Sequence, residues 1–381
     1  MEYCNGEEGS YWADLRIANG HREPYQVKLW GLGNEIGGNW ELGYCDTAYE
    51  YVKKAREFAM AMKEADPAIQ LIGCGAHFPI LDGIYQVPGG RFPNPSDNWN
   101  REVLDTMFDY LDYISIHDYI GHDYKDCIMD CWEEMGAEKV HYYLSEYMGV
   151  LEDAYQLMRQ DIRLAQHKHH KFKRIGVALD EYNPWYRSDG DTFCPYHVGD
   201  GLLVGSYFNI FIRNADVALL SNMAQLVNVL PAMVTESGKD GFYRTAVSYI
   251  QELFKDSCEK KSVDVWTDDP GWEGTYYDQV PYLDVSAVYD LENSILRLQI
   301  VNRNASEPVS FYLGVTGYEA VNVKGTVFGN QPINTVNTFE EPEKLRLHEF
   351  INSSRLPYIT VESLSVTVLD IVLAEKASDD F

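Results

Sequence analysis

Long apolar runs and a leader-like start are both missing from this sequence. No run of about 18 consecutive apolar residues occurs, so we expect no membrane-spanning helix and no membrane partner. The opening segment MEYCNGEEGSYW has no basic stretch followed by an apolar one, so no secretory signal is predicted. A cytoplasmic location is therefore expected.

Positive charge is also scarce. Lys and Arg number 31 against 59 Asp and Glu, giving a net charge of −28. A field of this sign repels nucleic acid and favours a neutral or cationic partner. The one basic run, QHKHHKFKR at 166–174, is interpreted as the exposed end of a helix, where cations suit the helix dipole.

Cysteines are few and lack the spacing of a metal clip. The seven are Cys4, Cys45, Cys74, Cys127, Cys131, Cys194 and Cys258. An odd, scattered set without a CxxC pair fits a reducing compartment and predicts no zinc site of that kind. Coordination of a metal by His117 and His122 remains an alternative, although a hydrogen bond from His117 to a carboxylate or sugar is favoured. No metal and no cofactor are expected.

Motifs of several other chemistries are absent. The sequence contains no GxSxG, GxxxxGK[ST] or HExxH, and no GxGxxG follows a strand. Aromatic residues, in contrast, are abundant at 13%, with 28 Tyr and 8 Trp. Such rings line sugar-binding clefts, but they also fill cores and oligomer interfaces, so both interpretations stay open.

Up to about residue 260, short β-prone runs alternate with helical ones, which indicates βα units around a parallel sheet. The expected strands are 27–34, 69–75, 113–119, 174–183 and 216–224. Between the first two, Thr47 and Glu50 form a capping box for a helix that ends at Asp66. The helix face expected to pack on the sheet comprises Tyr49, Val52, Ala55, Ala59 and Met62.

From residue 263 the pattern becomes repeated strands and turns, which predicts an antiparallel β-sandwich. The expected fold class is α/β plus all-β, with domains at 1–262 and 263–381. Five strands fall short of the eight that close a barrel. Either the sheet is open, or the chain is the C-terminal part of a longer one.

Polar side chains stand at the ends of the expected strands, where parallel sheets place ligand sites. They are Asn34, Glu35, His117, Asp118, Tyr119, Asp180, Glu181, Asn183, Asn222 and Gln225. Strand-end carboxylates can also cap helices or form ion pairs. Two glutamates on two strands of one sheet, however, match the carboxylate pair of glycoside hydrolysis, in which one protonates the leaving oxygen and the other attacks or activates water.

The ordered strand-end segments resemble the α-L-arabinofuranosidases of glycoside hydrolase family 51. The matching segments are VKLWGLGNEIGGNWELG, IQLIGCG, YISIHDY, VALDEYNPWY and NMAQLVNVL. EYCNG and NGHREPY near the start, and NTFEEPEKLR and LPYITVESLSVTVL near the end, extend the resemblance over essentially the whole chain. The resemblance implies a partial (β/α)8 TIM barrel containing strands four to eight, without strands one to three, followed by an antiparallel β-sandwich.

The resemblance also implies roles for individual residues. Glu35 corresponds to the general acid/base and Glu181 to the nucleophile, while Asn34 corresponds to the donor to the arabinose 2-hydroxyl. The other implied sugar ligands are His117, Tyr119, Trp185 and Gln225.

The implied function is that of a retaining, exo-acting α-L-arabinofuranosidase. It would act on an arabinose-containing oligo- or polysaccharide such as arabinan or arabinoxylan, and it could form a homo-oligomer. The alternatives are an endo-glucanase or xylanase of the same clan, and a truncated, non-catalytic carbohydrate-binding remnant.

Overall fold

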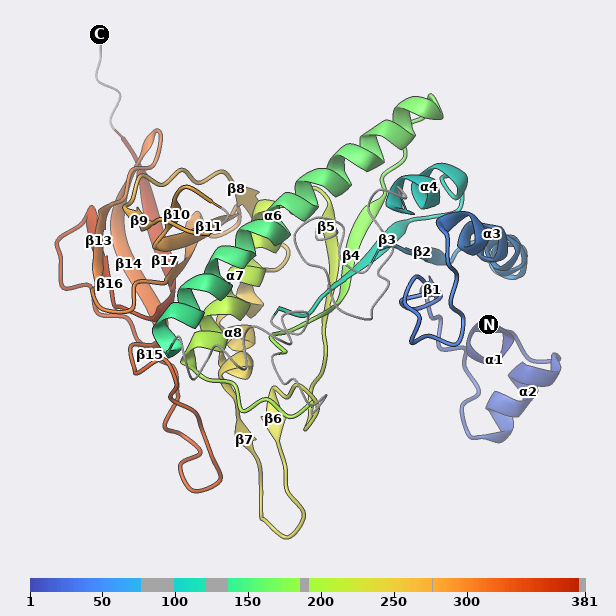
Figure 1. Ribbon diagram of the computed structural model, residues 1–381, viewed down its shortest axis with the longest axis horizontal. Helices are drawn as coiled ribbons and strands as arrows, with labels where there is room; N and C mark the ends of the chain where they lie inside the picture. The colour runs from blue at the N-terminus through green and yellow to red at the C-terminus, as the bar shows by residue number, and fades with distance from the viewer. Residues whose placement is uncertain (77–98, 121–135, 186–191, 276, 377–381) are drawn as a thin grey trace. The chain divides into compact units, whose positions relative to one another are not determined.

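The computed structural model describes residues 1–76, 99–120, 136–185, 192–275 and 277–376 (Figure 1). These residues form two compact units, each built from several stretches of the chain. The first comprises Met1–Asp118, Asp153–Glu181 and Val217–Asn222. The second comprises Tyr119–Glu152, Tyr182–Asp216 and Met223–Phe381. None of the described helices is both long and apolar enough to cross a membrane.

The first unit is organised by a five-stranded sheet whose spatial order is β1-β2-β3-β4-β5, the same as the order along the chain. The strands are β1 (Leu29–Leu32), β2 (Gln70–Cys74), β3 (Tyr113–Asp118), β4 (Gly176–Tyr182) and β5 (Ala218–Met223). The pairs β1–β2 and β2–β3 are parallel. All five expected strands are therefore confirmed, and the carboxyl ends of neighbouring strands meet at one edge.

The helices of the first unit follow the βα pattern. They are α1 (Glu2–Asn5), α2 (Tyr11–Ala18), α3 (Ala48–Ala65), α4 (Trp99–Thr106) and the C-terminal part of α6 (Ala137–Lys168). Helix α6 ends within the basic run as expected, and acidic partners lie close by. Lys168 and His169 contact Asp105, while Lys171 contacts Asp109 at 2.9 Å. The basic run is thus paired with carboxylates of its own unit.

Helix α3 begins and ends where its capping residues predict. The Thr47 hydroxyl accepts a hydrogen bond from the Glu50 N–H at 3.3 Å, and Asp66 caps the C-terminus. The expected buried face is wrong at one position, because Tyr49 is 69% exposed and Tyr51 is buried instead. Ala48, Tyr51 and Ala55 follow the helical spacing of three and four, whereas Tyr49 lies about 100° around the helix from Ala48.

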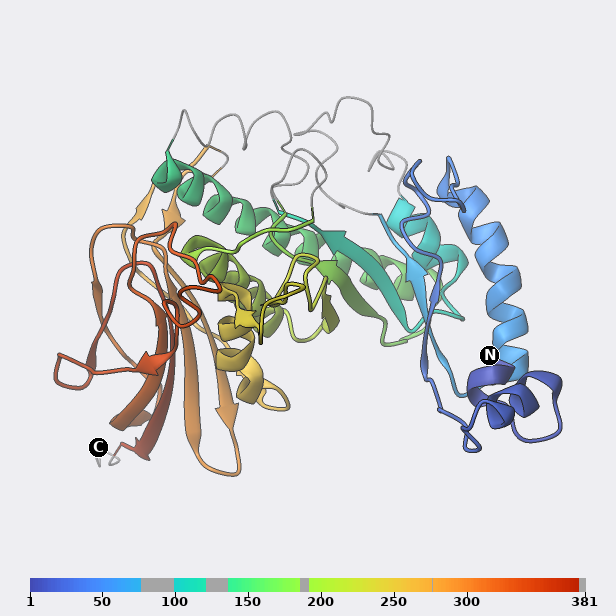
Figure 2. The ribbon, with the colours of Figure 1, turned by 90° about the horizontal axis from the view of Figure 1, so that it is seen from below.

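The second unit contains an antiparallel sheet of order β15-β14-β17-β12-β11-β8, drawn in orange to red in Figure 2. Its strands are β8 (Lys261–Val263), β11 (Leu283–Asp290), β12 (Ile295–Asn302), β14 (Tyr318–Gly329), β15 (His348–Glu349) and β17 (Ser365–Glu375). Three short pairs accompany it: β13 (Val309–Tyr312) with β16 (Tyr358–Val361), β9 (Gly271–Trp272) with β10 (Val280–Pro281), and β6 (Met233–Val234) with β7 (Tyr243–Arg244). The expected antiparallel, strand-rich C-terminal region is confirmed.

An apolar core joins the large sheet to the β13–β16 pair. It includes Leu298 and Ile300 of β12 with Ile359 and Val361 of β16. Alternate residues of a strand face the same side, which explains why the buried positions of β16 are two apart. The β13–β16 pair thus packs over one part of the sheet.

Helices also cover this sheet. They are α7 (Val198–Arg213) and α8 (Ala246–Phe254), followed by a 3₁₀ turn at Lys255–Ser257. The contact between α7 and the sheet is close because α7 carries Gly201 and Gly205. A Cβ atom at Gly201 would lie 2.6 Å from Cε1 of Phe328, and one at Gly205 would lie 2.9 Å from Cγ2 of Val301. The glycines are therefore explained by the approach of the helix backbone to the strands.

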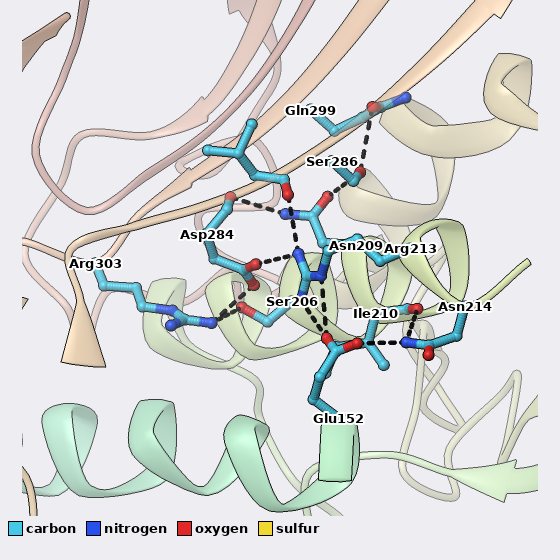
Figure 3. Close-up of polar contacts among 11 residues, drawn as sticks. Glu152, Ser206, Asn209, Ile210, Arg213, Asn214, Asp284, Ser286, Gln299 and Arg303 are labelled. Carbon is cyan, nitrogen blue, oxygen red and sulfur yellow. Dashed lines mark hydrogen bonds and ion pairs between the residues drawn. The ribbon is translucent and has the colours of Figure 1, made fainter. Parts of the chain in front are cut away.

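An ion cluster, buried at Asp284 and Arg303, joins α7 to β11 and to the residue that follows β12 (Figure 3). Asp284 accepts from Arg213 at 2.6 Å and from Arg303 at 2.7 Å, and Arg213 also pairs with Glu152 at 2.7 Å. Burial raises the pKa of Asp284, but the two guanidinium groups outweigh it and hold that pKa below its usual value. The two arginines thus neutralise the buried charge of Asp284, which would be destabilising without a partner.

Candidate active site

The stretch after β1 turns sharply and places Glu35 at the strand end. Gly33 has a φ of 103° and Glu35 a φ of 44°, so both lie in the left-handed region. Glycine adopts this region freely, but for Glu35 it costs about 1–2 kcal/mol. Strained backbone of this kind clusters at functional sites. The Glu35 side chain is only 13% exposed.

His117, at the end of β3, lies between carboxylates from two other strand ends. Its Nδ1 is 2.7 Å from Oε1 of Glu35 and 3.6 Å from Oε2 of Glu181, which stands near the end of β4. Its Nε2 is 3.2 Å from Oδ1 of Asp180. The structure thus brings Glu35, His117 and Glu181 together, as the strand-end pattern predicts.

Electrostatics make His117 a cation at neutral pH. Burial lowers its pKa, but hydrogen bonds to Asp180 and Glu35, with the negative charge of Glu181, raise that pKa to about 9. Both ring nitrogens then carry hydrogens and donate. One positive charge therefore lies among three carboxyl groups and offsets the negative charge that they carry when ionised.

The two glutamates are close enough to act on the two atoms of one bond. One carboxylate oxygen from each and a ring nitrogen of His117 all lie within 4.8 Å of one another. Glycosidases that retain configuration hold their carboxyl groups about 5–5.5 Å apart, whereas inverting enzymes need about 6.5–9.5 Å. The short separation fits the retaining geometry.

The same three side chains are spaced closely enough to surround a metal ion. A protonated imidazole, however, has no free lone pair with which to coordinate one. A metal ion bound here would therefore have to displace a proton from the His117 ring. His122, Cys127 and Cys131 lie outside the described residues.

Trp40 is a contact of Glu35 that the sequence analysis missed. Its indole Nε1 donates to Oε2 of Glu35 at 2.5 Å. A Cβ atom at Gly38 would lie 2.3 Å from the indole ring, so only glycine lets Trp40 fold back in this way. The motif GNEIGGNW contained this signal, because its glycine pair is separated from the tryptophan by Asn39 alone.

Ser115 and Cys74 also lie beside the cluster. Ser115 Oγ donates to Oδ1 of Asp180 at 2.6 Å. Burial, together with the negative charges of Asp180 and Glu35, raises the pKa of the Cys74 thiol to about 12. Strand alternation could have indicated Ser115, which lies two residues before His117 and so faces the same side.

Asn34 is exposed at the same strand end. Its side-chain amide donates to Oε1 of Glu41 at 3.2 Å. This contact is long and lies at the surface, so a hydroxyl group of a ligand could replace it.

The remaining expected sugar ligands belong to the second unit. Tyr119 is buried, and its ring packs edge to face on Trp185 with ring centroids 5.4 Å apart. Gln225 is exposed, and its backbone N–H donates to the Leu230 carbonyl at 3.4 Å. Asn183, expected among the strand-end polar groups, is fully buried and donates to the carbonyls of Ala224 and Leu230. Asn183 therefore has a structural contact.

Comparison with known proteins finds similarity to α-L-arabinofuranosidases over most of the chain. Residues 1–125 match the model of the α-L-arabinofuranosidase 1 domain, and residues 180–365 match that of the α-L-arabinofuranosidase C-terminal domain. An intracellular exo-α-(1→5)-L-arabinofuranosidase of Halalkalibacterium halodurans is 30% identical over 85% of this chain and 62% of the relative. A Bacillus subtilis protein of the same description is 30% identical over 88% of this chain and 64% of the relative. The chain thus spans less than two thirds of the length of either relative.

Solved structures give the same result. A thermostable family 51 α-L-arabinofuranosidase from Thermotoga petrophila matches with a TM-score of 0.77 and 28% identity, over 97% of this chain and 71% of that one. A family 51 enzyme from Bifidobacterium longum shares the fold with a TM-score of 0.84 at 21% identity, over 97% of this chain and 72% of that one. The family models, the relatives and the solved structures therefore all support the α-L-arabinofuranosidases of glycoside hydrolase family 51 as the family of this chain.

Proposed function

We propose that this chain carries the catalytic pair of a retaining, exo-acting α-L-arabinofuranosidase. The observation that carries the proposal is the approach of Glu35 and Glu181 carboxylate oxygens to within 4.8 Å, with His117 between the two side chains. The relatives named as exo-acting arabinofuranosidases support the choice of sugar and the mode of attack. An arabinose complex of a Thermotoga maritima relative supports an arabinose-containing ligand.

The proposed reaction has two displacements. Glu181 attacks the anomeric carbon while Glu35 gives its proton to the leaving oxygen, which breaks the glycosidic bond and forms a glycosyl ester on Glu181. Glu35, now ionised, takes a proton from a water molecule while the water oxygen attacks the anomeric carbon. This attack breaks the ester bond to Glu181 and releases arabinose. Two inversions give net retention.

Substrate contacts are part of the same proposal. Asn34 would donate to the 2-hydroxyl of arabinose in place of its contact with Glu41. His117, Tyr119, Trp185 and Gln225 would supply the other sugar contacts. Aromatic rings suit such a site, because they present an apolar face to the C–H groups of a sugar.

We infer that the five-stranded sheet corresponds to strands four to eight of a (β/α)8 barrel and that the strand-rich region forms a β-sandwich. Supporting observations are the sequential strand order and the apolar core beneath the β13–β16 pair. A domain division at 262/263, a homo-oligomeric state and a cytoplasmic location stay predictions. The last is supported by relatives named as intracellular.

Activity assays with matched variants test the proposal. The purified chain should release 4-nitrophenol from its α-L-arabinofuranoside and free arabinose from branched arabinan, and NMR of the first product should show retained configuration. Glu181→Gln should abolish turnover, and Glu35→Gln should lower kcat by about 10²–10⁴-fold. Glu8→Gln, which changes an exposed partner of Arg22, serves as the control.

Other outcomes separate the alternatives. Release of oligosaccharides without free arabinose would favour an endo-acting enzyme of the same clan. A cooperatively folded chain that binds arabinan without hydrolysing any arabinofuranoside would support the non-catalytic remnant. An inverted first product would overturn the double-displacement mechanism.

A further inference from the structure

The Asp180 carboxylate lies on the side of His117 opposite the two glutamates. We propose that Asp180, braced by Ser115, is a positioning residue that fixes the His117 ring between Glu35 and Glu181. The inference rests on the proposed function, in which these glutamates carry the reaction. It assigns roles to two side chains that need not touch the substrate.

The geometry gives one oxygen of Asp180 two donors. Oδ1 accepts from Ser115 Oγ at 2.6 Å and lies 3.2 Å from Nε2 of His117. Ser115 and His117 face the same side of β3, so the strand itself sets their spacing. Asp180 is thereby held in place from the strand that carries the imidazole.

This contact decides which ring nitrogen faces the glutamates. While Nε2–H donates to Asp180, Nδ1 points toward Glu35 at 2.7 Å and toward Glu181 at 3.6 Å. A carboxylate behind an imidazole fixes the orientation of the ring, as in the serine protease triad. His117 is only 5% exposed, so water cannot readily replace Asp180 as the acceptor.

The charge on His117 provides an independent measurement of this contact. The titratable groups around it are Glu35, Asp180 and Glu181, with the Cys74 thiol beside Asp180 and Glu35. Hydrogen bonds to Asp180 and Glu35 raise the pKa of His117 against the effect of burial. If Asp180 becomes a neutral amide, burial remains while part of the stabilisation of the cation is lost, so the pKa of His117 should fall.

NMR titration of ¹³C-labelled histidines tests the inference without a substrate. The His117 signal is assigned by its absence from His117→Gln. In Asp180→Asn its pKa should fall by about 1–3 units, with a smaller fall in Ser115→Ala. Asp109→Asn, an exposed carboxylate paired with Lys171 in the same unit, should leave the signal unchanged.

Kinetics on 4-nitrophenyl arabinofuranoside give the second readout. In Asp180→Asn, displacement of the His117 ring by about 1 Å should lower kcat by about 10²-fold with little change in KM. The basic limb of the kcat–pH profile should also move to lower pH. Asp180→Glu should recover part of this loss. If Asp180→Asn does not fold, Ser115→Ala decides both readouts by itself.

Two results would overturn the inference. One is an unchanged His117 titration in the Asp180 and Ser115 variants, and the other is a shifted titration with an unchanged kcat. An inactive wild type with the expected titration shift would instead refute the proposed function and leave the positioning contact standing.

Discussion

Tyr51 is the residue that connects α3 to the ends of β1 and β2. Its hydroxyl donates to the Leu32 carbonyl of β1 at 2.9 Å and accepts from the Cys74 N–H of β2 at 2.7 Å. The ring stacks on Trp99 at 5.7 Å. One buried side chain thus satisfies backbone groups at the ends of two neighbouring strands.

Tyr51→Phe should destabilise the chain without removing the ring contact. The change leaves a buried N–H and a buried carbonyl unpaired, which should lower the free energy of unfolding by about 1–3 kcal/mol. Urea unfolding measures the difference. Tyr49→Phe, on the same helix but 69% exposed, is the matched control and should change little. Equal effects of the two substitutions would contradict the assigned hydrogen bonds.

The catalytic pair could be predicted from the sequence, but the contacts of Trp40 and Tyr51 could not. Glu35 and Glu181 could be paired from sequence, because parallel strands bring their carboxyl ends to one edge. The Trp40 contact depends on the backbone path through Gly38, and the burial of Tyr51 depends on which helix face meets the sheet. Neither is specified by residue type alone.

At the scale of elements, the five strands were predictable because most of them are short, nearly continuous apolar runs. The association of α7 with the antiparallel sheet was not predicted. Helix α7 precedes the strand-rich region in the chain, and the change in sequence pattern falls at residue 263, after both α7 and α8. The pattern of apolar and polar residues indicates whether a segment is a helix or a strand, whereas the elements it packs against depend on the tertiary fold.

Gly201→Ala should show how tightly α7 is packed. The added Cβ would meet the fully buried ring of Phe328 at 2.6 Å, so we expect a loss of about 1–3 kcal/mol despite the better helix propensity of alanine. Thermal or urea unfolding measures it. The pair Gly201→Ala with Phe328→Leu should lose less than the sum of the single changes, because a smaller side chain relieves the overlap. Strict additivity would show that the two positions do not interact.

At the scale of the whole molecule, two buried histidines give the two units opposite responses to pH. In the second unit, burial lowers the pKa of His141 to about 4, and its Nε2 donates to the Arg303 carbonyl at 2.9 Å. In the first unit, His117 has a pKa of about 9. The unfolded value for both is about 6.5.

The direction in which stability changes with pH follows from the number of protons that each state binds. Between pH 6.5 and 4 the unfolded chain binds more protons at His141 than the folded one, so stability should fall on acidification by up to about 3 kcal/mol. The His117 contribution is fully present below about pH 6.5 and is lost as pH rises through about 9. His141→Gln should flatten the acidic loss and leave the alkaline one, as followed by urea midpoints across pH. Parallel curves for wild type and variant would refute this assignment.

The route of the polypeptide between the units has a consequence of its own. The chain passes from one unit to the other after Asp118, Glu152, Glu181, Asp216 and Asn222. Each unit is therefore built from separate stretches of the chain. A single backbone cut between Tyr119 and Asn222 leaves two fragments that both contain residues of the second unit. In such a cut chain, the contacts inside the second unit would still connect residues of both fragments.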